Sequence, residues 1–353
     1  MSRPPLRVAL LGAGTVGREV ARAILERPVE LAAHDGAPIT LVGIALRDLD
    51  RARAGGLPAE LLTDAPAHLV ASPEVDVVVE LMGGDEPART LIDAALGAGK
   101  AVVTANKHVL AHHGGELEAT SRRTKAPLRF EASVGGGIPV LGPIATDLAA
   151  NRISAVRGIV NGTTNYILTA MTEAGRDYGD VLAEAQAAGY AEADPTGDVE
   201  GLDAVNKLVI LARLAFGRWL PPEAIRHVGE EGAGAGSPGI TGITAADIAR
   251  ATADGDVIKL IATAERGPNG DIAASVLPRA LPAHSALART SGVLNRIEID
   301  AEPLGTVAFS GPGAGGAATS SAVLGDLIAI ARGLDSTWAG LPPAHAVALA
   351  AAR

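Results

Sequence analysis

The chain has 353 residues, 48% of them hydrophobic and 20% charged, as expected for a globular protein with room for two domains. Its net charge of −10 and its aromatic content of 2% argue against a nucleic-acid surface, which needs clustered cations and stacking platforms. The chain has no cysteine, which excludes disulfides, thiolate metal sites and a cysteine nucleophile, and a reducing, cytoplasmic location is expected.

Apolar runs alternate with helical patterns along the first part of the chain, and none reaches the ~18 apolar residues of a membrane span. The first run, Leu6–Leu11, follows arginines as in a signal peptide, but it is short and ends at Gly12, which favours a strand. Further strands are predicted at 39–46, 75–81, 101–104 and 128–132, and helices at 87–96 and 116–123. This alternation predicts an α/β fold, with a Rossmann-type parallel sheet domain at residues 1–133.

The second half of the chain has a mixed pattern, which predicts an α+β domain at residues 134–310. The glycine-rich stretch 311–316 opens a last segment, 311–353, in which we expect a helix at 318–330. The other predicted elements are strands at 155–160, 297–299 and 307–309, and helices at 163–171, 181–188 and 203–216.

Gly12, Gly14 and Gly17 have the spacing of a dinucleotide-binding turn, with a strand before them and a helix after. The spacing alone is common in ordinary turns, but this context favours a nucleotide whose pyrophosphate lies at the helix N-terminus. The acidic residue that usually contacts the ribose is absent from its expected place. The second strand instead leads to Arg47, which could bind a 2′-phosphate or could simply face solvent, so NADP and NAD both remain candidates.

Thr104 and Lys107 lie where the strand predicted at 101–104 ends. Ligands of doubly wound sheets bind at the carboxyl ends of the strands, which makes Lys107 a candidate site residue. An isolated lysine is more often a surface residue, and this alternative stays open.

The stretch 189–208 is the most informative part of the chain because carboxylates there precede an aspartate–lysine pair. Glu192 and Asp198 lie among Gly, Pro and Thr, which is typical of a loop. Asp203 and Lys207 are four residues apart, so a helix places them on one face. They could form an ordinary surface pair, but the apolar residues after Lys207 predict a buried helix, where a carboxylate can tune a lysine for acid–base chemistry.

The segment Asn161–Asn165 joins a predicted strand to a predicted helix and contains typical capping residues. It could serve only as a cap, or it could also present polar groups to a substrate.

Taken together, these segments resemble homoserine dehydrogenase. The similarity is carried by residues 12–17, 105–107, 130–139, 158–168, 188–211 and 311–315. The resemblance implies reversible, NAD(P)-dependent interconversion of L-homoserine and L-aspartate 4-semialdehyde, in threonine, methionine and isoleucine biosynthesis. The alternatives are another semialdehyde or hydroxy-acid dehydrogenase and an inactive nucleotide-binding regulator.

The resemblance also implies roles for individual residues. Lys207 would be the acid–base residue, oriented by Asp203, with Lys107 assisting at the same oxygen. The substrate would be recognised by Glu192, Asp198 and Tyr190. The nucleotide would be contacted by Gly12, Gly14, Thr15, Val16, Gly17, Arg47, Thr104, Lys107 and Gly313. A monovalent cation, sodium or potassium, would be bound by Glu131, Val134, Gly136 and Ile138.

The same resemblance implies the protein's partners. We expect a small-molecule substrate, catalysis and dimerisation in residues 134–310, a homodimer or higher homo-oligomer, and a last helix that returns to the nucleotide domain. We expect neither nucleic acid nor a membrane as a partner. Longer family members carry a C-terminal ligand-sensing domain, and residues 331–353 are too few for one, so threonine is expected to have little effect.

Overall fold

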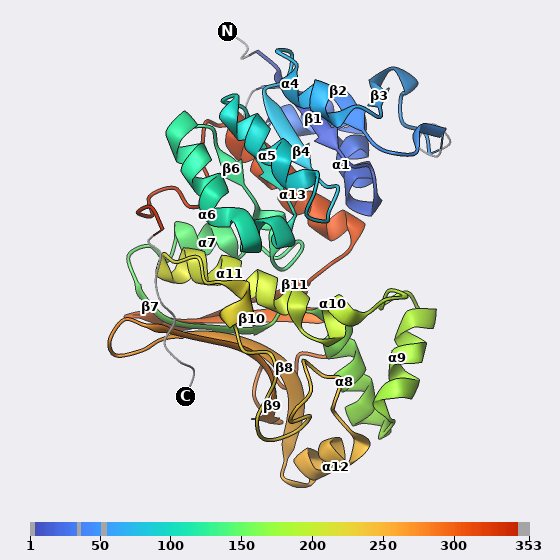
Figure 1. The fold of residues 1–353 in the computed structure, drawn as a ribbon, viewed down its shortest axis with the longest axis vertical. Coiled ribbons are helices and arrows are strands. Elements are labelled where there is room, and N and C mark those ends of the chain that lie inside the picture. Colours follow the sequence, from blue (N-terminus) through green and yellow to red (C-terminus); the bar gives the residue numbers. More distant parts are fainter. Residues whose placement is uncertain (1–3, 34–36, 51–54, 345–353) are drawn as a thin grey trace. The chain divides into compact units, whose positions relative to one another are not determined.

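A computed structural model describes residues 4–33, 37–50 and 55–344 (Figure 1). The chain forms two compact units, one from the residues up to 145 together with 314–343, and the other from residues 146–313. The chain therefore passes from the first unit to the second after residue 145 and returns after residue 313. These points lie 12 and 3 residues beyond the predicted boundaries at 133 and 310.

The first unit contains a six-stranded parallel sheet with the strand order β3-β2-β1-β4-β5-β6. The chain runs outward from β1 to β3 and then returns to β4 beside β1, so the strand order reverses between β1 and β4. Such a reversal is where doubly wound sheets bind ligands. The strands are β1 (Leu6–Leu11), β2 (Ile39–Ala45), β3 (Leu62–Thr63), β4 (Val77–Glu80), β5 (Ala101–Thr104) and β6 (Leu128–Arg129).

Helices cover this sheet, and the last of them comes from the far end of the sequence, because α13 packs against α1. Val8 and Val79 of the sheet share one buried cluster with Val323 and Leu327 of α13, which explains the continuous apolar runs in the strands. The helices are α1 (Thr15–Glu26), α2 (Pro28–Ala33), α4 (Pro66–Ala71), α5 (Ala88–Gly97), α6 (Lys107–Thr124), α7 (Leu141–Ala145) and α13 (Gly316–Ala331), with 3₁₀ turns at 59–61 and 131–133.

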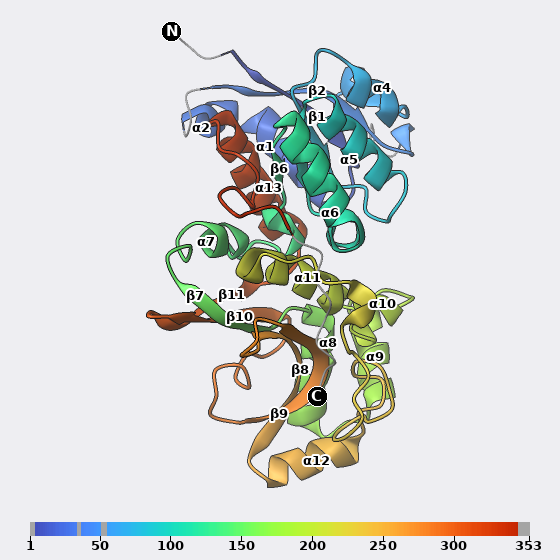
Figure 2. The same cartoon turned by 60° about the vertical axis from the view of Figure 1, so that its left-hand side comes forward.

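The second unit contains a five-stranded antiparallel sheet with the order β11-β10-β7-β8-β9. Its strands are β7 (Arg152–Ile159), β8 (Asp256–Arg266), β9 (Ile272–Pro282), β10 (Leu294–Glu302) and β11 (Gly305–Pro312). Helices α8 and α11 both pack against β8 (Figure 2). The helices are α8 (Gly162–Ala174), α9 (Tyr178–Ala187), α10 (Thr196–Val199), α11 (Leu202–Phe216) and α12 (Ala245–Ala253), with a 3₁₀ turn at 222–224.

The predicted fold class is confirmed, with a Rossmann-type parallel sheet and a second, mixed unit. Several elements differ from their prediction. The two longest strands, β8 and β9, and helix α12 were not predicted, and α6 begins at Lys107 rather than at 116. The strand predicted at 128–132 ends at Arg129, and a 3₁₀ turn follows. Among the described residues, no helix is long and apolar enough to cross a membrane.

Candidate functional site

The turn between β1 and α1 is tightly packed at two of its glycines and open at the third. Gly12 has a φ of +97°, and a Cβ added there would lie 2.5 Å from the Leu81 carbonyl oxygen. A Cβ at Gly17 would lie 2.1 Å from the Gly12 carbonyl oxygen. These two glycines are therefore required by the protein itself, whereas a Cβ at Gly14 would meet no atom within 4 Å. The open space at Gly14 leaves room for a ligand to approach the backbone.

The N-terminus of α1 is the second feature of this turn. Gly14 is the N-cap, and no side chain caps the helix there. Thr15 is exposed and Val16 is half-buried, so the first turn of the helix is open to a ligand. Uncapped N–H groups and the helix dipole both favour an anion. The predicted cofactor residues of this turn thus fit the phosphates of a dinucleotide.

The carboxyl ends of β4 and β5 are joined by a buried carboxylate, Glu80, whose exposed fraction is 0%. Thr104 Oγ1 donates to Glu80 Oε2 at 2.6 Å, and the Met82 and Gly83 N–H groups donate to Oε1 at 2.8 and 3.1 Å. Burial raises the pKa of Glu80, and these hydrogen bonds oppose that rise. Glu80 was not predicted as a site residue, although a single carboxylate ending the apolar run Val77–Val79 is a visible signal.

Lys107 and Arg47 both follow strands at this edge of the parallel sheet. Lys107 is half-buried and is the first residue of α6, directly after Asn106, whose side chain caps the helix by accepting from the Val109 N–H at 3.1 Å. Arg47 is exposed and lies two residues beyond β2. Both positions agree with ligand binding at the carboxyl edge.

The loop after β6 contains the predicted cation ligands. Glu131 Oε1 accepts from the Val140 and Leu141 N–H groups at 2.7 and 2.8 Å, and Oε2 accepts from Gly142 N–H at 2.7 Å. Burial and the nearby Asp326 raise the pKa of Glu131, and these hydrogen bonds oppose that rise. The side chain of Glu131 thus binds the start of α7.

The backbone carbonyls of this loop have a different environment. Val134, Gly136 and Ile138 are buried, and no hydrogen bond within the described residues ends on their carbonyl oxygens. Buried carbonyls usually have a partner. Carbonyl oxygens are also ligands that hard cations prefer, so their chemistry fits a monovalent cation. No cluster of three or more His, Asp or Glu suited to a metal occurs in the part of the chain that the structure describes.

In the second unit, Asp203 and Lys207 form a close pair in the first two turns of α11. Lys207 Nζ donates to Asp203 Oδ2 at 2.6 Å and to the Val160 carbonyl oxygen at 2.7 Å. The two residues are only 9% and 8% exposed, which confirms the predicted shared face and the predicted burial. These bonds hold the lysine nitrogen between the helix and the segment that follows β7.

Asn161 brings a second carboxylate to this pair. Its Nδ2 donates to Asp198 Oδ1 at 2.7 Å and to Asp203 Oδ2 at 2.9 Å. Its Oδ1 accepts from the Thr164 N–H at 2.8 Å and thereby caps α8. Asn161 is therefore both a cap and part of the polar cluster.

The other predicted substrate residues, Tyr190 and Glu192, are exposed. Thr163 Oγ1 is 3.0 Å from Asp198 Oδ2 and 2.8 Å from the Tyr190 carbonyl oxygen, which connects Asp198 to the preceding loop. The ring of Tyr190 packs against that of Tyr166, with 4.7 Å between centroids. The structure thus groups Asp198, Asp203 and Lys207 closely, whereas Glu192 is exposed on the loop between α9 and α10.

Gly313 follows the last strand of the second unit. A Cβ at this position would lie 1.8 Å from Asn295 Oδ1, so the chain requires glycine here whatever else it contacts. Asn295 is fully buried, and neither polar atom of its side-chain amide has a hydrogen-bond partner among the described residues.

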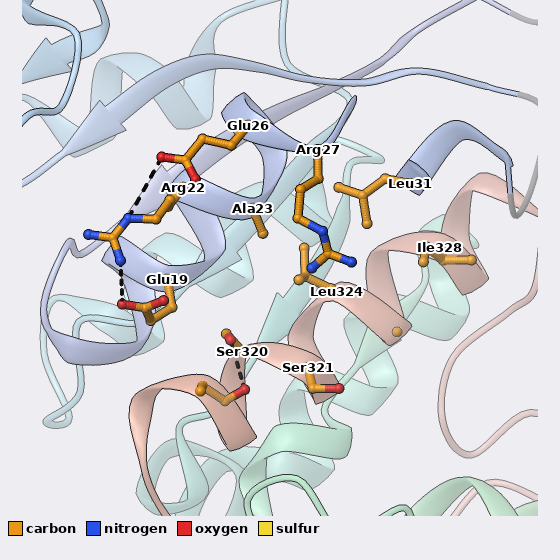
Figure 3. Close-up of a pocket in the computed structure, with 12 residues that line it drawn as sticks. Glu19, Arg22, Ala23, Glu26, Arg27, Leu31, Ser320, Ser321, Leu324 and Ile328 are labelled. Atoms are coloured by element: carbon orange, nitrogen blue, oxygen red, sulfur yellow. Dashed lines mark hydrogen bonds and ion pairs between the residues drawn. The ribbon is translucent and has the colours of Figure 1, made fainter. Parts of the chain in front are cut away.

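A groove of about 490 Å³ lies between α1 and α13 in the first unit (Figure 3). Its charged rim is internally paired, with 3.0 Å between Arg22 Nη1 and Glu19 Oε1. None of the predicted site residues lines the groove, and we assign it no function.

Two family models match the chain. The model described as homoserine dehydrogenase matches residues 139–328, and that described as the homoserine dehydrogenase NAD binding domain matches residues 12–131. The homoserine dehydrogenase of Corynebacterium glutamicum is 46% identical over 347 residues, which cover 95% of this chain and 76% of that protein.

Solved structures agree with these matches. A homoserine dehydrogenase from Thiobacillus denitrificans is similar with a TM-score of 0.87 and 41% identity, over 93% of this chain and 73% of that one. A hyperthermophilic archaeal homoserine dehydrogenase in complex with NADPH is similar with a TM-score of 0.73 and 29% identity, over 92% and 97% of the two chains. The resemblance inferred from the sequence is confirmed.

Proposed function

The chain belongs to the homoserine dehydrogenase family of NAD(P)-dependent oxidoreductases, and we propose that Asp203 and Lys207 form the acid–base pair of its reaction. The reaction interconverts L-homoserine and L-aspartate 4-semialdehyde, and the nicotinamide, when bound, accepts or supplies the hydride. The protein must then take the proton from the substrate hydroxyl group, or return it in the reverse direction.

The observation that supports this assignment is the buried 2.6 Å contact between Lys207 Nζ and Asp203 Oδ2. A carboxylate this close stabilises the ammonium that forms when a lysine accepts a proton. The Val160 carbonyl, 2.7 Å from Nζ, holds the nitrogen in one place, and a fixed donor is what proton transfer needs. We therefore assign proton transfer to Lys207 and its orientation to Asp203.

Carboxylates of the second unit are suited to recognise the substrate ammonium group. We propose that Asp198, Glu192 and Tyr190 form this part of the site. Both carboxylate oxygens of Asp198 lie within hydrogen-bond distance of neighbouring side chains, which fix its orientation. We propose Lys107 as a second catalytic lysine because it begins α6, just beyond the carboxyl end of β5, where such sheets bind ligands.

The test is Lys207→Ala. We expect kcat to fall by ~10²-fold or more, the usual scale for lost general acid–base catalysis. Binding of NADP(H), measured separately, should be unchanged, because the predicted phosphate turn lies in the first unit. A folded variant with the kcat of the unchanged protein would remove Lys207 from the mechanism.

We propose NADP(H) or NAD(H) as the cofactor, bound by Gly12, Gly14, Thr15, Val16 and Gly17. Arg47, Thr104, Lys107 and Gly313 complete the proposed contacts. The open turn at Gly14 and the uncapped start of α1 support this assignment.

We propose a sodium or potassium ion at the carbonyls of Val134, Gly136 and Ile138, next to Glu131. The three residues are buried, and no hydrogen bond within the described residues ends on their carbonyl oxygens, which supports the proposal. Sodium or potassium chloride should raise the unfolding temperature above that in choline chloride of equal ionic strength. Equal temperatures in the three salts would contradict the proposal.

We also propose a homodimer or a higher homo-oligomer that acts in threonine, methionine and isoleucine biosynthesis. Strand β11 supports the assembly, because it is an edge strand with none of its residues buried, and such an edge can pair with a second copy. Sedimentation that detects only monomers at assay concentrations would contradict it.

A further inference from the structure

We infer that Asn161 is a positioning residue that holds Asp203 and Asp198 in the geometry that the acid–base pair needs. The inference rests on the proposed role of Lys207 and extends it to a residue with no chemistry of its own. Asn161 is 5% exposed and lies between β7 and α8, two residues after the strand ends. From there its side chain contacts α10 and α11 at the same time.

The orientation of this amide is determined by its contacts. The Thr164 backbone N–H can only donate, so the atom 2.8 Å from it must be the amide oxygen. The amino group must then face the carboxylates, and its two protons match two acceptors, Asp198 Oδ1 at 2.7 Å and Asp203 Oδ2 at 2.9 Å. Donors and acceptors thus correspond one to one.

The contact on Asp203 connects Asn161 to proton transfer. Asp203 Oδ2 accepts from Asn161 and from Lys207 Nζ, so one oxygen receives both groups. Asn161 also offsets the repulsion between two carboxylates brought close together, because it donates to each. Without the amino group, Asp203 Oδ2 loses a hydrogen bond that orients it toward Lys207, and Asp198 loses its contact with Asn161 and keeps that with Thr163.

The cap role allows a variant that separates function from folding. Serine is also a favoured N-cap residue, so Asn161→Ser keeps an acceptor for the start of α8 while it removes the amino group. Thr244→Ala is the matched control, because Thr244 caps α12 of the same unit through the Asp247 N–H and has no part in the cluster. Both variants should fold.

We expect Asn161→Ser to lower kcat by about 10- to 100-fold, the scale of a catalytic group displaced by about 1 Å. NADP(H) affinity should stay unchanged, and Thr244→Ala should keep its kcat. The decisive measurement is the double variant Asn161→Ser/Lys207→Ala. If Asn161 acts through Lys207, kcat of the double variant should equal that of Lys207→Ala within about twofold, because residues that act as a unit are not additive.

Two results would overturn the inference. One is an Asn161→Ser enzyme with unchanged kcat while Lys207→Ala is impaired. The other is a double variant whose losses multiply, which would show that Asn161 affects activity by a separate, structural route. Failure of the proposed function is distinguishable from both, since it appears in the single variant Lys207→Ala.

Discussion

At the scale of one residue, we propose that Arg47 determines which cofactor the first unit prefers. Sheets of this type that bind NAD usually carry an acidic residue after the second strand, whereas an arginine accommodates the 2′-phosphate of NADP. Arg47 is exposed and follows β2. Its guanidinium can donate two parallel hydrogen bonds to a phosphate.

Arg47→Asp should therefore weaken NADP(H) binding more than NAD(H) binding, because the phosphate loses a cation and meets a like charge. The ratio of the two dissociation constants is the quantity to measure. Arg123→Asp is the control, because Arg123 lies in the last turn of α6, whereas Lys107 begins that helix. It makes the same charge change and should leave that ratio unaltered. An unchanged ratio of the two dissociation constants in Arg47→Asp would show that Arg47 does not recognise the 2′-phosphate.

Local and distant contacts differ in how well the sequence predicts them. The Asp203–Lys207 pair was predicted because four residues of helix bring the side chains together. The contact of Asn161 with Asp203 crosses 42 residues, and no spacing rule reaches that far. The capping pattern identified Asn161 as a polar residue at a helix start. Only the folded structure, in which α8 packs against α10, shows which carboxylates its amino group contacts.

At the scale of elements, two strands were missed, and the prolines of β9 explain why that strand was not predicted. Strand β9 contains Pro278 and ends at Pro282, and proline usually argues against a strand because it cannot donate to the ladder. In the structure β9 is an edge strand of its sheet. A proline without a backbone N–H donor costs little stability at such an edge. The start of α6 was missed because Gly114 and Gly115 weaken the helical pattern.

The glycine turn supports a prediction about an element as a whole. Gly17→Ala would place Cβ 2.1 Å from the Gly12 carbonyl oxygen, a backbone atom, so α1 must shift relative to β1. We expect a lower unfolding temperature and weaker cofactor binding. Gly14→Ala is the matched variant, because its Cβ meets nothing within 4 Å. It should keep the unfolding temperature while it weakens NADP(H) binding. Equal thermal stability of the two variants would contradict the assigned strain.

At the scale of the whole molecule, each unit contains its own spectroscopic reporter. The chain has two tryptophans, Trp219 in the second unit and Trp338 in the first. Trp338 is 2% exposed and packs against Phe130, with 5.3 Å between ring centroids. Its fluorescence therefore reports on the core of the unit that contains the proposed phosphate turn.

In a Trp219→Phe background, NADP⁺ should raise the unfolding temperature reported by Trp338. A ligand that binds only the folded state at 100 times its Kd stabilises that state by about 2.7 kcal/mol. The shift should follow the logarithm of NADP⁺ concentration, and Gly17→Ala in the same background should reduce it at a fixed concentration. A Trp338 transition that does not respond to NADP⁺, while a Trp338→Phe protein shows a shift through Trp219, would place the main cofactor contacts in the second unit. The turn at Gly12–Gly17 would then no longer be the phosphate site.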